Sequence, residues 1–131
     1  MSAETPRPTL LKVGGHPWVD RWRDWLVEAG YQVLRARDFQ EALLLARRAQ
    51  PRLILIVDDP KNHLDAIEWL ELQHIDSDPL LPMLPLLIVT GRQGGAEARL
   101  QELPDRVQVL ERPLDPEALI EKVRAMINAW W

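Results

Sequence analysis

The run LILIV at residues 53–57, followed at once by DDP at residues 58–60, decides the fold class of this chain. An unbroken aliphatic run is typical of a strand covered on both faces, because a half-exposed strand alternates apolar and polar residues. Two acids and a proline then end the run, since all three favour turns. These residues therefore predict the central strand of a sheet that has helices on both sides.

Similar segments recur on both sides of the central strand. Short apolar runs predict further strands at residues 10–13, 31–34, 86–89 and 107–110. Apolar residues at helical spacing predict helices at residues 17–29, 39–46, 64–74, 96–103 and 116–130, and the proline-containing segment 75–85 is expected to be a loop. Strands that alternate with helices in this way predict a doubly wound α/β fold, with a five-stranded parallel sheet and helices on both faces.

Capping residues mark the start of two of these helices. Asp38 and Glu41 have the spacing of a capping box, with Asp in place of Ser or Thr. Asp115, Pro116 and Glu117 supply a cap residue, a proline suited to the first helical position and an acid in the first turn. We expect helices to begin at both places.

Length and composition restrict the classes of protein that need consideration. The chain has 131 residues, 47% of them hydrophobic and 27% charged, which suits one globular domain. No apolar run approaches the roughly 18 residues of a membrane-spanning helix. We expect residues 1–8 to be a disordered N-terminal segment and residues 9–131 to form one domain in the cytoplasm, with no membrane partner.

Cysteine content and charge exclude further kinds of site. The chain contains no cysteine, which excludes disulfides, thiolate nucleophiles and thiolate metal ligands. Its net charge is -4 and its basic residues are scattered, whereas nucleic-acid binding requires clustered Lys and Arg to displace counterions from phosphates. We therefore expect no nucleic-acid partner.

Candidate functional residues follow the ends of four predicted strands. Ligands of doubly wound sheets bind outside the carboxyl ends of the strands, near the point where the strand order reverses. The residues at those ends are Gly14, Gly15, Asp58, Asp59, Thr90 and Arg112. We expect them to form one pocket.

The order of these features resembles the receiver domain of response regulators, over about Thr9 to Trp130. In that family an aspartate at the end of the third strand accepts a phosphoryl group, a hydroxyl residue closes the fourth strand, and a lysine before a proline closes the fifth. Thr90 and Arg112-Pro113 stand at the last two positions with the family's spacing. The resemblance implies a flavodoxin-like sheet with strand order 2-1-3-4-5 and a role in bacterial two-component phosphorelay signalling, with a histidine kinase or an output domain as partner.

The sequence departs from the family where the receivers hold Mg²⁺. Receivers carry a pair of acids after the first strand, but this chain has Gly14-Gly15, which have no side-chain oxygen to offer. Mg²⁺ needs oxygen ligands that usually include one or two carboxylates. The next residue, His16, carries an imidazole, which is a poor ligand for so hard a cation. We expect no metal site and no cofactor.

The phosphoacceptor position is ambiguous between two neighbouring residues. Counting forward from Pro51 as in typical receivers places it at Val57, whereas counting back from Asp65-Ala66 places it at Asp58. Neighbouring side chains of a strand point to opposite faces, so only one of the two can face the pocket. Asp58 is the candidate phosphoacceptor, and Asp59 is expected to begin the following loop. Without a metal, Arg112 would pair permanently with Asp58 or Asp59.

Three functions stay open at this point. The first is a degenerate receiver that works as a phosphorylation-independent interaction module, with its partner surface near the last strand and the flanking helices. The second is a true phosphoacceptor that uses Asp58 with Thr90 and Arg112, with Asp59 as a lone metal anchor. The third is an enzyme or nucleotide-binding protein, which we do not expect because no phosphate-binding glycine motif, serine elbow or metal-binding His pair is present.

The C-terminal pair Trp130-Trp131 is a further feature of the sequence. Large apolar residues at a chain end normally need covering. A homodimer interface would cover them, and so would contact with the first helix of the same domain.

Overall fold

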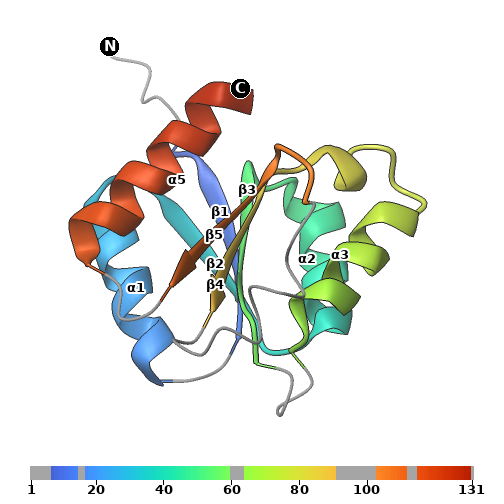
Figure 1. Ribbon diagram of the computed structural model, residues 1–131, viewed down its shortest axis with the longest axis horizontal. Coiled ribbons are helices and arrows are strands. Elements are labelled where there is room, and N and C mark those ends of the chain that lie inside the picture. Colours follow the sequence, from blue (N-terminus) through green and yellow to red (C-terminus); the bar gives the residue numbers. More distant parts are fainter. Residues whose placement is uncertain (1–6, 15–16, 60–63, 91–102, 112–114, 131) are drawn as a thin grey trace.

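The computed structural model describes residues 7–14, 17–59, 64–90, 103–111 and 115–130, which form a parallel sheet between two layers of helices (Figure 1). The strands are β1 (Thr9–Val13), β2 (Gln32–Ala36), β3 (Leu53–Val57), β4 (Leu86–Thr90) and β5 (Val107–Glu111). The helices are α1 (Pro17–Glu28), α2 (Phe39–Ala49), α3 (Ala66–Ile75) and α5 (Pro116–Trp130), with a short 3₁₀ helix η2 (Leu81–Met83). The helix expected at residues 96–103 lies, except for its last residue, outside the described residues.

The strand order is β2-β1-β3-β4-β5, and every neighbouring pair is parallel. This confirms the flavodoxin-like order 2-1-3-4-5 and the central position of β3. All five residues of β3 are fully buried, as are those of β4, in agreement with the unbroken aliphatic run. None of the described helices combines the length and the apolar character needed to cross a membrane.

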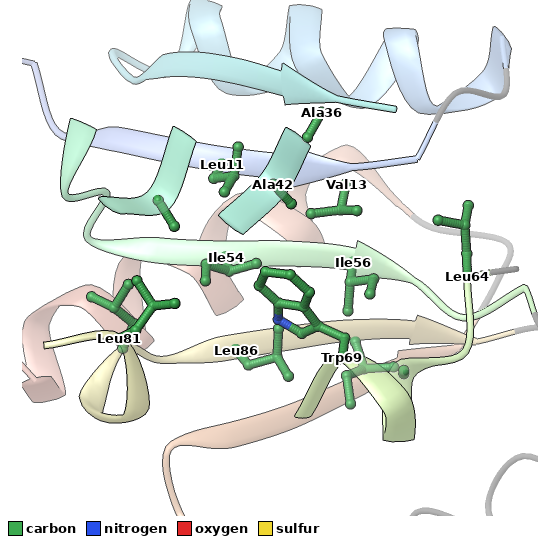
Figure 2. Packing of buried hydrophobic residues seen from close by; sticks show 14 of the residues in the cluster. Leu11, Val13, Ala36, Ala42, Ile54, Ile56, Leu64, Trp69, Leu81 and Leu86 are labelled. Carbon is green, nitrogen blue, oxygen red and sulfur yellow. The ribbon is translucent and has the colours of Figure 1, made fainter. Parts of the chain in front are cut away.

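Each face of the sheet is covered by its own apolar cluster. Alternate residues of the central strands point to opposite faces, so that Ile54 and Ile56 meet α2 and α3, while Leu55 and Val57 meet α1 and α5. On the first face the indole of Trp69 lies over the strands near Ile54 and Leu86 (Figure 2). Full burial of each such side chain contributes roughly 1.5–3 kcal/mol, so the two clusters fix which face each residue takes.

The hydrogen bonds at the start of α2 differ slightly from those that the sequence predicted. Asp38 caps α2 and accepts a hydrogen bond from the amide of Glu41 at 2.8 Å. The Glu41 carboxylate accepts from Arg37 N at 3.3 Å, one residue before the position that a capping box uses. At the start of the sheet, Pro8 O accepts a hydrogen bond from Gln32 N at 2.9 Å.

The segment expected to be a loop is held by a buried glutamine. Gln73 of α3 is fully buried and accepts from the indole N–H of Trp69 at 2.9 Å. Its amide nitrogen donates to the carbonyl oxygens of Leu81 at 2.8 Å and Leu84 at 3.0 Å. These bonds fasten η2 and the start of β4 to α3, because buried polar groups need partners inside the protein.

Candidate functional site

The strand register brings three of the predicted pocket residues to one edge of the sheet. Val13 pairs with Ile56 and Val57 with Val89, so Gly14, Asp58 and Thr90 each lie at or just beyond a carboxyl end. Backbone bonds extend this edge: Gly14 N donates to Ala36 O at 3.0 Å and Asp58 N to Val89 O at 2.8 Å. Gly15, His16 and Arg112 lie outside the described residues, so the expected pairing of Arg112 with an aspartate stays a prediction.

Gly14 faces Val57 across this edge. The Val57 side chain is fully buried and belongs to the apolar cluster under α1 and α5. A Cβ atom on Gly14 would lie 3.5 Å from Val57 Cγ2. The backbone of Gly14 also has a φ of 137°, a conformation that residues other than glycine rarely adopt. A hydrocarbon therefore occupies the place next to β1 at which an acidic pocket would need oxygen.

Asp58 points to the other face of the sheet and caps α3. Its carboxylate is buried, with 6% of the residue exposed, and Oδ1 accepts a hydrogen bond from Ala66 N at 2.9 Å. Asp65 Oδ1 accepts from the next amide, Ile67 N, at 2.8 Å. Two aspartates thus satisfy two of the free amides at the start of α3, where the helix dipole also favours negative charge.

Asp59 forms an isolated bridge with Leu64 after the end of β3. Its amide donates to Leu64 O at 2.8 Å and its carbonyl accepts from Leu64 N at 3.0 Å, which makes a small antiparallel bridge. The bridge joins the residue after Asp58 to the residue before Asp65. It therefore holds both capping aspartates close to the amino end of α3.

Thr90 carries a buried hydroxyl group that has no hydrogen-bond partner among the described residues. The residue is fully buried, and among the described residues Oγ1 finds no hydrogen-bond partner. By the alternation along β4, its side chain lies on the same face as Asp58 in the neighbouring strand. An unpaired buried hydroxyl costs roughly 1–3 kcal/mol, so this group is a feature that either stability or function must explain.

The described residues do not fit the Mg²⁺ that receivers use. Within this part of the chain, no three His, Asp or Glu side chains are close enough together to hold a metal ion. Gly14 and Val57 offer no side-chain oxygen, and one oxygen of Asp58 is engaged by the amide of Ala66. Mg²⁺ requires near-octahedral oxygen ligation, and Gly14 and Val57 contribute no side-chain ligand to it.

Sequence reasoning missed a buried lysine below this edge. Lys12 lies in the middle of β1 with only 1% of its surface exposed, and it pairs in register with Arg35 and Leu55. It takes part in an interaction within the protein, as a buried ammonium group must. The signal was present, since a lysine interrupts the apolar run of the first strand.

Comparison with known proteins agrees with the fold. No protein-family model matches the chain. The polar-differentiation response regulator DivK of Brucella anthropi is 29% identical over 119 residues, which cover 82% of this chain and 85% of that protein. Similar solved structures include a sensor protein from Polaromonas sp. JS666, with a TM-score of 0.80, 21% identity and coverage of 96% of this chain and 100% of the other.

A second structure is the signal receiver domain of a signal transduction histidine kinase from Syntrophus aciditrophicus. Its TM-score is 0.78 at 21% identity, with coverage of 93% of this chain and 91% of the other. At such identities the structures show the fold, and the relationship to DivK adds the sequence evidence. The chain therefore has the fold of receiver domains, and its sequence is similar to that of a response regulator.

Proposed function

We propose that this receiver-type domain is a phosphorylation-independent interaction module of two-component signalling, with a histidine kinase or an output domain as its partner in the cytoplasm. The observation that supports this most is the hydrogen bond from Ala66 N to the buried carboxylate of Asp58. It gives the candidate acceptor a structural task at the start of α3. We assign no catalytic role to any residue.

The neighbouring residue supports the same proposal. Val57 is the other candidate for the acceptor position, and its side chain is a hydrocarbon that cannot carry a phosphoryl group. It faces Gly14, where receivers have the first of their acids. In this arrangement the domain holds a single conformation at the carboxyl edge, and its partner recognises the surface that this conformation presents.

A phosphoacceptor using Asp58 is the second candidate function, and Thr90 is the observation in its favour. The Thr90 hydroxyl lies on the same face as Asp58 and has no partner among the described residues. In this alternative a carboxylate oxygen of Asp58 attacks the phosphorus of a donor, the donor's leaving group departs, and the hydroxyl donates to the new phosphoryl oxygens. The amide of Ala66 would then donate either to the remaining carboxyl oxygen of Asp58 or to another acceptor.

Intact-mass spectrometry after incubation with acetyl phosphate and Mg²⁺ separates the two functions. We expect no species heavier by one phosphoryl group, under conditions in which a receiver with its acid pair is labelled. Labelling of the wild type and of Asp59→Asn, together with its loss in Asp58→Asn, would contradict the proposal. Labelling that persists in Asp58→Asn would point to another residue and would exclude both versions.

A further inference from the structure

A groove opens at the amino-terminal edge of the sheet, opposite the edge that carries Asp58. Helices of a parallel α/β fold run antiparallel to the strands, so the C-terminal end of α5 reaches the starts of β4 and β5 (Figure 1). The groove has a volume of about 390 Å³ and is lined by Leu80, Pro82, Met83, Leu84, Arg106 and Trp130. Its size is within the roughly 300–1,000 Å³ of typical ligand pockets.

The rim of the groove exposes large apolar side chains. Leu80 is 47% exposed, Met83 68% and Trp130 46%. Trp130 also borders a second hollow of about 330 Å³, which residues of α5 and β5 line. Clustered apolar exposure of this kind marks interaction sites, and Trp, Met and Arg are residue types enriched at protein interfaces.

Arg106 alone carries a charge among the described residues that line the groove. One of its guanidinium nitrogens, Nη1, donates to Leu84 O at 3.1 Å, and no acidic side chain in the described part of the chain pairs with it. Partial burial lowers the pKa of Arg106 from its ordinary value. A guanidinium has five N–H donors in a planar fork, so donors are left for an incoming carboxylate.

The groove is held in shape before any partner arrives. Leu84 O accepts from Arg106 Nη1 and also from Gln73 Nε2 at 3.0 Å, so one carbonyl ties the start of β5 to α3. Gln73 also holds Leu81 O, which fixes η2. A preformed site loses less conformational entropy on binding.

We propose that this groove binds a protein partner through a segment that presents a large apolar side chain next to a carboxylate. The apolar side chain fills the space between η2 and Trp130, and the carboxylate pairs with the Arg106 guanidinium. The charge of Arg106 and the apolar character of the other lining residues together select this chemistry. A purely apolar segment would leave the cation uncompensated, and a highly charged one would leave the apolar rim in water.

This inference deepens the proposed function, because it assigns the module a contact surface and its partner a chemistry. It agrees with the expectation that the partner surface lies near the last strand and the helices flanking it. The two ideas fail separately, however. Labelling of Asp58 by a phosphodonor would leave the groove intact, and loss of binding at the groove would leave the cap of α3 intact.

The test is a titration of the full chain with two short peptides, acetyl-Phe-Glu-amide and acetyl-Phe-Gln-amide, followed by two-dimensional ¹H–¹⁵N NMR. The peptides differ only in the carboxylate. We expect the Glu peptide to shift the indole N–H signal of Trp130 saturably, at millimolar concentration. We expect the Gln peptide to bind about tenfold more weakly, since charge-assisted hydrogen bonds are roughly twice as strong as neutral ones.

Two variants locate the effect. Arg106→Gln should reduce the affinity for the Glu peptide to that for the Gln peptide, whereas Arg48→Gln, a control on the exposed face of α2, should change neither. If Arg106→Gln does not fold, Met83→Ala serves instead and should weaken the saturable binding that the Trp130 indole reports. Equal affinity of the two peptides, shifts that map away from Trp130, or no saturation would each overturn the proposal.

Discussion

Asp58 and Ala66 are joined by a hydrogen bond of 2.9 Å between a buried carboxylate and the first backbone amide of α3. The bond links the end of the central strand to the start of the helix that follows it. It places the first of the two acids that follow β3 on the face away from Val57, at the positive end of a helix dipole. The role of this carboxylate decides between a capped scaffold and a phosphorylatable receiver.

The first prediction concerns the strength of this cap. Asp58→Ala leaves the buried amide of Ala66 without its acceptor and should lower the free energy of unfolding by about 1–3 kcal/mol. Asp58→Asn keeps an acceptor oxygen and loses only the charge near the dipole, at a cost of about 0.3–1 kcal/mol. Urea unfolding measures both.

The control for this cap is Asp115 at the start of α5. Its Oδ2 accepts from Ala118 N at 3.2 Å, but Asp115 is exposed. Asp115→Ala should therefore lower the free energy of unfolding by less than Asp58→Ala does, because water can replace the lost acceptor. An unchanged urea midpoint in Asp58→Ala would show that the bond to Ala66 does not stabilise the fold.

The second prediction concerns the unpaired hydroxyl of Thr90. Thr90→Val replaces the hydroxyl by a methyl group of similar size and should raise the free energy of unfolding by up to about 1 kcal/mol, because a buried group without a partner is removed. Thermal and urea unfolding measure the change. A loss of stability greater than about 1 kcal/mol would show that the hydroxyl has a partner that the described residues do not supply.

The third prediction concerns the buried glutamine that fastens η2. Gln73→Leu leaves the indole N–H of Trp69 without its partner and removes one of the two hydrogen bonds that the carbonyl of Leu81 accepts, and should cost about 1–3 kcal/mol. Trp69→Phe removes the indole N–H that donates to Gln73 but keeps the two bonds from Gln73 to the backbone, so the loss of hydrogen bonding should lower the free energy of unfolding by less than Gln73→Leu does. A double-mutant cycle should give an interaction energy between Trp69 and Gln73 of at least about 0.5 kcal/mol. Strict additivity would contradict direct coupling.

The fourth prediction concerns pH. The hydrogen bond from Arg47 holds the pKa of Asp76 below its ordinary value of 3.8, since Arg47 and Asp76 form an ion pair between α2 and the end of α3. The folded protein therefore releases this proton more readily than the unfolded chain. The resulting stability is present above the unfolded pKa and is lost as the pH falls through the folded pKa, below about pH 4.

Unfolding free energies measured from pH 7 down to pH 3 test this contribution. Asp76→Asn should flatten the acid limb of the profile, because the uncharged side chain has no folded-state pKa to shift. Asp24→Asn is the control, since Asp24 lies exposed on α1 at 3.8 Å from Arg23. An acid limb as steep in Asp76→Asn as in the wild type would contradict the assignment to this pair.

The sequence predicted much of the fold because its strongest signals are local. The aliphatic run of β3 has the bounds that its pattern indicated, and Asp38 caps α2 as its spacing with Glu41 suggested. The strand order is not a local property, and it came from the resemblance to receivers. The helix expected at residues 96–103 stays a prediction.

The site was harder to predict because it depends on one residue of register. Sequence spacing placed the acceptor position at Val57 from one side and at Asp58 from the other. Only three-dimensional placement shows that Val57 faces Gly14 while Asp58 meets Ala66.

The groove around Arg106 could not be found from the sequence at all. Its walls come from η2, the start of β5 and the end of α5, which are far apart along the chain. The sequence drew attention to Trp130-Trp131 only as a pair that needs covering. In the structure Trp130 borders two hollows beside β5, and 46% of its surface is exposed.

The most direct test of the capping role is the NMR signal of the Ala66 amide during addition of beryllofluoride, a mimic of an aspartyl phosphoryl group, with Mg²⁺. We expect this amide to keep its chemical shift, because its acceptor on Asp58 is not available to the mimic. A saturable, Mg²⁺-dependent shift of the Ala66 and Thr90 amides that disappears in Asp58→Asn would contradict the capping role and establish Asp58 as a phosphoacceptor.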